Sequence, residues 1–539
     1  MYRPHSIAAP SRAATVAKAA FTALAITLAA PALHATGLPS TNVAWMPAAA
    51  EADIERAFTR AKAEKKPVLL YWGATWCPPC NQLKATLFNR QEFAALSKNF
   101  VAVHVDGDRP GAQRLGTRFK VSGYPTTVLF TPEGQEITRL PGEVDAPQAL
   151  AVLQLGLSGG REVKSVLADA LAGKTLTINE WRLLAFYSWE TDEQQLVPKA
   201  EVAGTLTRLA AASPAGANGE AETTTRLWLK ALAASDAGKG VKADEALRLR
   251  VNKVLADARE VRTQMDVLTN GAADIVRTLE DEVSPRRAPL VAAFDKALKA
   301  LEADATLSRG DRLGALIARV DLARLKEPKD SVSPKLPEPL LADLREHVAR
   351  ADREITDGYE RQAVITAAAY ALGLGGLWAE SDALLKSNLA KSHSPYYLMS
   401  QLGSNARKRG MKDEALRWYG EAFDKSQGPA TRLQWGAGYL SALVDLAPQD
   451  GARIEKVAAQ LLREAAGDTG AFEGRSVRAL QRASTKLVAW NGEGKHAAAI
   501  KRLQAQAEGL CAKLDAADGQ RAACDKLLKP APAAALKPA

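Results

Sequence analysis

The chain has 539 residues, of which 47% are hydrophobic, 24% charged and 6% aromatic. This balance is ordinary for a globular protein and excludes a chain that is collagen-like or disordered throughout. The sequence contains one long apolar stretch, near the N-terminus, so a multi-span membrane protein is excluded as well. The formal charge of +10 comes without a Lys/Arg block interleaved with aromatic residues, so we do not expect nucleic-acid binding.

Residues 1–35 have the pattern of a secretory signal peptide. Arg3, Arg12 and Lys18 precede an apolar run over residues 19–33, no Asp or Glu occurs, and small residues follow. This order of cationic start, apolar middle and small-residue end is typical of export signals. We therefore expect a periplasmic or secreted protein without stable membrane insertion. The same composition leaves an uncleaved anchor and a mitochondrial transit peptide as alternatives.

Residues 43–157 alternate between predicted helices and strands. Helices are predicted over 49–64, 80–88, 92–96 and 146–155, and strands over 67–72, 100–105, 126–130 and 136–140. The first two strands are continuous apolar runs, as in strands buried on both faces. A Thr-Pro-Glu-Gly turn joins the last two strands into a hairpin. The order β-α-β-α-β-β-α predicts an α/β domain with a mixed sheet.

The rest of the chain is predicted to be almost entirely α-helical. Proline-rich residues 326–339 separate a helical region at 161–325 from another at 340–529, residues 212–219 form a loop, and 530–539 form a disordered tail. A segment that begins at Gly376 recurs 34 residues later at Gly410. This period resembles that of tetratricopeptide-type helix pairs, with an irregular helical bundle as the alternative.

The most specific motif is Trp-Cys-Pro-Pro-Cys over residues 76–80. It follows the predicted strand 67–72 and opens a helix, and a Gly-Tyr-Pro-Thr segment precedes the hairpin about 45 residues later. Together these features resemble the thioredoxin superfamily, most of all exported thioredoxin-like reductase domains such as the C-terminal domain of the transmembrane disulfide reductases. The resemblance implies that Cys77 and Cys80 are catalytic and that no cofactor is needed. It also implies a cis peptide bond before Pro125 and substrate contacts from Trp76, Tyr124 and Pro125.

The two cysteines suit thiol–disulfide exchange, in which the thiolate is the nucleophile. Cys77 is predicted at a helix N-terminus, where the helix dipole favours negative charge, with its side chain pointing outward. Cys80 lies one turn further on the buried side, in a position to resolve a mixed disulfide. Pro78 and Pro79 suit a first helical turn and remove two N–H donors, which leaves mainly that of Cys80. Because no His or Lys separates the cysteines, we expect a reducing or intermediate potential.

The sequence departs from the thioredoxin pattern at the position of a buried proton acceptor. Many thioredoxins carry an Asp six residues before the first cysteine, and here that residue is Tyr71. The Lys that often accompanies the Asp matches an apolar position near Ala102. A buried water or a partner's group is expected to take the proton instead. We expect His104, on the second predicted strand, to be a core or edge residue and not a base.

Cys511 and Cys524 are placed symmetrically about a predicted turn between two helical arms. In an oxidising compartment this arrangement predicts a structural disulfide, with a second redox relay or free thiols as alternatives. No metal site is expected, because the histidines are scattered and no His-x-x-x-His spacing occurs.

These patterns predict an exported thiol–disulfide oxidoreductase of the protein-disulfide reductase type. Cys77 would attack and Cys80 would resolve, while the helical region would be the docking surface for protein substrates or for an electron-donor protein. Two alternatives remain: a non-catalytic binding or scaffold protein that uses the helical repeats, and a metal chaperone that uses the cysteine pair.

Overall fold

The computed structural model describes residues 43–140, 142, 145–189, 192, 195–214, 220–235, 240–328 and 330–529. All of them belong to one compact unit. The predicted signal peptide and the predicted C-terminal tail lie outside the described residues. Within the described ranges, no helix has both the length and the apolarity that a membrane crossing requires.

A five-stranded mixed sheet, in the order β1-β3-β2-β4-β5, forms the centre of the N-terminal α/β part of the chain, which we call the α/β domain. The strands are β1 (Met46–Ala48), β2 (Val68–Gly73), β3 (Val101–Asp106), β4 (Thr126–Phe130) and β5 (Glu136–Leu140). β1 and β2 run parallel to β3, and β4 is antiparallel to β2 and β5. The predicted mixed sheet is therefore confirmed.

The two faces of the sheet follow from the alternation of side chains along β2. Val68, Leu70 and Trp72 pack against α1 (Glu51–Glu64) and α4 (Ala112–Arg118). Leu69 and Tyr71 face the opposite side. That side is covered by α2 (Pro78–Thr86), α3 (Gln91–Leu96) and α5 (Ala146–Leu157). The 3₁₀ helix η1 (Ser97–Asn99) continues α3.

Two short elements were not located from the sequence. β1 spans three residues, which is too short for a period to be visible, and α4 contains Gly116 and Thr117, which have low helix propensity. From β2 onward, with α2 and α3 taken together, the observed elements have the order β-α-β-α-β-β-α. The helix between the second and third strands of this order is α4, for which the sequence patterns gave no range.

The helices that follow α5 begin with α6 (Val163–Leu171), α7 (Ile178–Phe186), η2 (Lys199–Glu201), α8 (Val202–Ala212), α9 (Glu220–Ala233), α10 (Glu245–Ala256), α11 (Ala258–Thr263), α12 (Met265–Leu279), α13 (Arg287–Ala303), α14 (Arg309–Ala323) and η3 (Arg324–Lys326). They continue with α15 (Glu338–Glu354), α16 (Gly358–Leu374), α17 (Trp378–Asn388), η4 (Leu389–Lys391), α18 (Pro395–Lys408), α19 (Lys412–Lys425), α20 (Pro429–Leu446), α21 (Gly451–Ala466), α22 (Gly474–Trp490), η5 (Gly492–Gly494), α23 (Ala497–Cys511) and α24 (Gly519–Cys524). No strand occurs among the described residues after β5.

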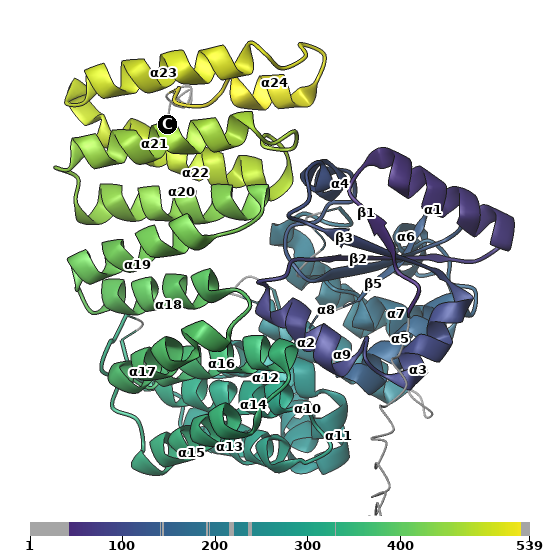
Figure 1. Ribbon diagram of the computed structural model, residues 1–539. Coiled ribbons are helices and arrows are strands. Elements are labelled where there is room, and N and C mark those ends of the chain that lie inside the picture. The colour runs from purple at the N-terminus through teal and green to yellow at the C-terminus, as the bar shows by residue number, and fades with distance from the viewer. Residues whose placement is uncertain are drawn as a thin grey trace, which may run out of the picture. The chain divides into compact units, whose positions relative to one another are not determined.

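The hydrophobic cores cross the predicted domain limits. One core joins the α2–α3–α5 face of the sheet to α6–α9, and another joins the start of α2 to α14, α16 and α18. Figure 1 shows α2 beside α16. The α/β domain is thus packed against the helical region on more than one side.

The predicted 34-residue repeat corresponds to two helix pairs. Gly376 lies between α16 and α17, Gly410 lies between α18 and α19, and their φ angles are +77° and +76°. Glycine adopts this left-handed conformation without steric cost. The match supports equivalent turns, while the tetratricopeptide assignment itself remains a prediction.

Candidate redox site

Cys77 and Cys80 begin helix α2. Cys77 is the N-cap residue, Pro78 and Pro79 occupy the first turn, and the Sγ of Cys77 accepts a hydrogen bond from the backbone N–H of Cys80 at 3.2 Å. The cysteines form a disulfide with their Cα atoms 5.2 Å apart. An N–H directed at this sulfur, together with the helix dipole, favours the thiolate once the disulfide is reduced.

The other predicted site residues lie beside this helix start. The peptide bond between Tyr124 and Pro125 is cis, and the ring centroid of Tyr124 is 6.5 Å from that of Trp76. Pro125 is half-buried. Thus the structure brings together the segments that the sequence placed about 45 residues apart.

The expectation that Cys77 points outward is wrong for this conformation. Cys77 is 2% exposed, Cys80 is fully buried and Trp76 is 7% exposed. All three belong, together with Ala74, to a hydrophobic core whose remaining members come from the chain between α14 and α20. The helical region lies directly over the redox motif, which the sequence patterns did not predict.

Six residues of the helical region contact the segment from Thr75 to Trp76, and we call them the cover: Gln362, His393, Tyr397, Thr431, Trp435 and Arg475. The Trp76 ring meets Trp435 edge-on with centroids 5.0 Å apart and stacks on Tyr397 at 6.0 Å. The Arg475 guanidinium lies 5.0 Å from the centroid of the same ring. Aromatic and cation–π contacts therefore enclose Trp76 from the helical side.

The cover also holds the backbone before Cys77. Gln362 Nε2 donates to the carbonyl oxygen of Trp76 at 3.3 Å, and His393 Nε2 lies 3.1 Å from the carbonyl oxygen of Thr75. Sequence reasoning missed the residues of the cover, because they lie about 290 to 400 positions from the motif and carry no local signature of their own.

Asp108, in the loop after β3, links the α/β domain to the start of α20. Its carboxylate accepts hydrogen bonds from the backbone N–H of Thr431 at 2.8 Å and from the Thr431 hydroxyl at 2.6 Å. The indole N–H of Trp76 donates to Thr431 Oγ1 at 2.6 Å and to Asp108 Oδ2 at 3.0 Å. Burial raises the pKa of Asp108 to about 6, although the Thr431 hydroxyl opposes this shift.

Tyr71 occupies the position of the expected proton acceptor. Its ring stacks on His104 at 5.0 Å, and its buried hydroxyl has no hydrogen-bond partner among the described residues. Burial raises the pKa of Tyr71 above its usual value, and burial followed by the charge of Lys84 lowers the pKa of His104 to about 4. At neutral pH Tyr71 is therefore a neutral phenol and His104 a neutral imidazole, so neither supplies a charge to the cysteine pair.

Cys511 and Cys524 also form a disulfide, with their Cα atoms 5.6 Å apart. They are the last residues of α23 and α24, and both are buried in the core of the C-terminal helices. The Asp518 carboxylate in the intervening turn pairs with Arg114 of α4. The turn closed by this disulfide thus contacts the α/β domain.

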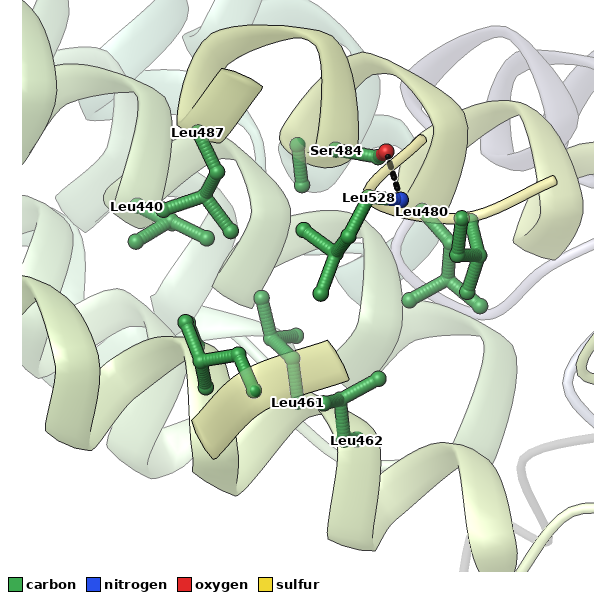
Figure 2. Close-up of a pocket in the computed structure, with 11 residues that line it drawn as sticks. Leu440, Leu461, Leu462, Leu480, Ser484, Leu487 and Leu528 are labelled. Atoms are coloured by element: carbon green, nitrogen blue, oxygen red, sulfur yellow. Dashed lines mark hydrogen bonds between the residues drawn. The ribbon is translucent and has the colours of Figure 1, made fainter. Parts of the chain in front are cut away.

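A small cavity lies in the same C-terminal core, away from the redox motif. Figure 2 shows its leucine-rich lining, in which Ser484 Oγ accepts a hydrogen bond from the backbone N–H of Leu528 at 2.7 Å. Its volume is about 30 Å³, which is room for very few waters, and the apolar walls offer few polar partners. The cavity therefore adds no binding site. Across the described ranges, no group of three or more His, Cys, Asp or Glu side chains is arranged to hold a metal ion.

Comparison with known proteins places the motif in a family. A model described as thioredoxin-like domain matches residues 54–156. The thioredoxin-like protein slr0233 of Synechocystis is 34% identical over 90 residues, which cover 17% of this chain and 81% of that protein. The chain belongs to the thioredoxin-like family.

Longer relatives match about a fifth of this chain. Thiol:disulfide interchange protein DsbD 2 of Pseudomonas aeruginosa is 32% identical over 121 residues, 22% of this chain and 21% of that protein. DsbD 1 of the same organism is 31% identical over 120 residues, 22% of this chain and 20% of that protein. The chain therefore spans about a fifth of the length of these two relatives. A solution structure of a thioredoxin from Thermus thermophilus is 29% identical, covering 20% of this chain and 83% of that one, with a TM-score of 0.18.

Proposed function

We propose that this protein is an exported thiol–disulfide oxidoreductase that reduces protein disulfides. The observation that carries the proposal is the position of Cys77, whose sulfur accepts the Cys80 N–H at the N-terminus of α2. The names of the matched interchange proteins and the thioredoxin-like fold of residues 54–156 support the same chemistry.

In the proposed reaction, the Cys77 thiolate attacks one sulfur of a substrate disulfide and releases the other as a thiolate. The Cys80 thiolate then attacks the Cys77 sulfur of the mixed disulfide and releases the second substrate thiolate. Two electrons pass to the substrate, and the enzyme is left with the Cys77–Cys80 disulfide that the structure contains. A dithiol donor protein must reduce this disulfide again, and the donor is itself oxidised to a disulfide.

Export is part of the proposal and is supported by one feature of the sequence and one of the structure. Residues 1–35 have the composition of a signal peptide. Cys511 and Cys524 are joined by a disulfide that spans thirteen positions, a cross-link that persists in oxidising compartments and is rare in reducing ones.

Reduction of insulin by the full chain, driven by a thiol donor, tests the activity. The wild type should precipitate insulin chains catalytically, and Cys77→Ser should lower the rate at least about a hundredfold because the nucleophile is gone. The double variant Cys511→Ser/Cys524→Ser is the matched control and should remain active. Equal activity of Cys77→Ser and the wild type would disprove the assignment.

The client can be captured with Cys80→Ser. This variant should accumulate mixed disulfides through Cys77, because the resolving thiolate is missing. Mass spectrometry of the trapped species identifies the partner and the cysteine that holds it. A Cys77→Ser/Cys80→Ser variant is the control and should trap nothing at this site.

A non-catalytic binding protein is the second candidate, and the burial of Cys77 is the observation that favours it. In that case the Cys77–Cys80 disulfide would brace the junction with the helical region. The insulin assay separates the two candidates, since a binding protein would show no turnover.

A further inference from the structure

The cover occupies the surface through which Cys77 would meet a substrate. Trp76, which precedes Cys77, and Tyr124, which precedes the cis proline, both lie against the Arg475 guanidinium of α22, at 5.0 Å and 4.5 Å from the ring centroids. With Cys77 at 2% exposure, a protein disulfide cannot approach the sulfur in line with its S–S bond in this conformation.

The contact between Asp108 and α20 completes a helix end. Gly428 is the N-cap of α20 and has no side chain to accept the first N–H groups, and Pro429 follows it. Asp108 of the α/β domain accepts the Thr431 N–H instead, so it serves as a capping residue from another part of the chain. A Cβ atom at Gly428 would lie 2.7 Å from the Cβ of Asp108, so glycine permits this approach.

Other polar contacts join α4 of the α/β domain to the start of α22 and to Tyr124. Gln113 Oε1 accepts the backbone N–H of Arg475 at 2.7 Å, and Gln113 Nε2 donates to the Tyr124 hydroxyl at 2.9 Å. Thr117 Oγ1 accepts the N–H of Gly474 at 3.0 Å. Water can replace such hydrogen bonds when the surfaces part, so separating them costs less than separating an equal apolar area.

We propose that the cover is autoinhibitory, that the hydrogen bonds of Thr431 with Asp108 and Trp76 hold it closed, and that Cys77 exchanges disulfides after the helices that carry the cover move away. The proposal rests on the proposed function and adds its regulation. A client or donor that binds the helical region and favours the open form would then couple its own docking to exposure of the thiolate.

Alkylation of Cys77 in full-length, reduced protein tests the cover without requiring turnover. A Cys80→Ser background leaves Cys77 as the single thiol of the motif, and peptide mapping separates its modification from that of the C-terminal cysteines. The parent should react slowly with iodoacetamide at neutral pH, and more slowly still with a polymer-linked maleimide. In a denaturing concentration of urea, both reagents should modify Cys77 as fast as they modify a solvent-exposed cysteine.

Thr431→Val, made in that background, removes the hydroxyl that joins Trp76 to Asp108 and keeps the size of the side chain. It should raise the alkylation rate about tenfold, which corresponds to about 1.4 kcal/mol in the opening equilibrium. Thr485→Val is the matched control, because Thr485 is exposed on α22 and bonds Gln481 of the same helix. Its rate should stay within about twofold of the parent.

A second variant keeps the test decisive if Thr431→Val does not fold. Tyr397→Leu removes a half-buried ring that stacks on Trp76 and should also accelerate alkylation. Fast alkylation of the parent with both reagents, or unchanged rates in both cover variants, would overturn the proposal.

Insulin reduction by variants that retain Cys80 separates this inference from the proposed function. Faster alkylation of the cover variants without any insulin reduction would support the cover and contradict the reductase function. Rapid insulin reduction by the wild type with no gain in Thr431→Val would support the function and contradict the cover.

Discussion

The two disulfides of the described residues are both buried, but one lies at a helix N-terminus and the other joins two helix C-termini. Cys77 is the N-cap of α2, whereas Cys511 and Cys524 are the last residues of α23 and α24. The helix dipole stabilises a thiolate at an N-terminus and destabilises one at a C-terminus. Position on the helix, and not burial, therefore distinguishes the pair suited to exchange from the pair suited to cross-linking.

The two disulfides also differ in what buries them. Cys511 and Cys524 are packed among α20–α24, close to them in the sequence. Cys77 and Cys80 are packed against α14–α20, which follow more than two hundred residues later. A cover from a distant segment can move without unfolding the helix that it covers. Exposure of Cys77 and Cys80 can therefore be regulated while α2 stays folded.

Stepwise reduction of the wild type should show the largest difference between the pairs. Cys77–Cys80 should titrate between about −270 and −180 mV, and Cys511–Cys524 should remain oxidised until below about −300 mV. Thiol trapping with peptide mapping across a series of redox buffers measures both. A value near about −120 mV for Cys77–Cys80, or earlier reduction of Cys511–Cys524, would contradict the contrast.

Removal of each disulfide should affect stability unequally. Cys511→Ser/Cys524→Ser should lower the free energy of unfolding by about 3 kcal/mol, because the disulfide closes the longer loop. Cys77→Ser/Cys80→Ser should lower it by about 2 kcal/mol on the same loop-entropy estimate. Urea unfolding of both variants under one set of conditions provides the comparison, and the reverse order would show that the motif disulfide is the main brace.

The link between the two parts of the chain should depend on pH through Asp108. Burial raises its pKa from 3.8 to about 6, so the folded protein binds this proton more tightly than the unfolded chain does. The stability that Asp108 contributes is therefore fully present below about pH 4 and lost as the pH rises through about 6. The charged or titratable groups around it are Asp106, Tyr124, Tyr396 and Arg475.

Asp108→Asn tests this dependence because asparagine does not titrate. The melting temperature of the variant minus that of the wild type should increase between about pH 4 and about pH 7. Thermal unfolding followed by circular dichroism measures it, with Asp274→Asn as control at an exposed carboxyl on α12. A difference that is constant with pH would show that Asp108 keeps its ordinary pKa.

Tyr71→Phe should have the smallest effect. The hydroxyl has no hydrogen-bond partner among the described residues, so its removal breaks no hydrogen bond. Burial raises its pKa, so it stays protonated at neutral pH and its removal takes away no proton acceptor. Insulin reduction should stay within about twofold of the wild type, and stability within about 1 kcal/mol. A larger loss of rate in stopped-flow measurements of the resolving step would assign Tyr71 a part in proton transfer.

Much of the α/β domain could be predicted because its signals are local. The apolar runs of β2 and β3, the Pro-Glu-Gly turn of the hairpin and the prolines after Cys77 each act over a few residues. The same local chemistry predicted that the Cys80 N–H would face the sulfur of Cys77. The short strand β1 was missed because three residues show no period.

The sequence by itself determined which cysteine stands at a helix start, that Cys511 and Cys524 flank a turn, and that an α/β part of the chain is followed by an all-α part. The tertiary structure decided that Cys77 is covered. Thr431 reaches Trp76 across 355 positions, and its partner Asp108 lies in a loop with no motif of its own. Contacts of this range depend on how successive helix pairs stack, which is a sum of many small packing angles, and no local pattern of residues specifies that sum.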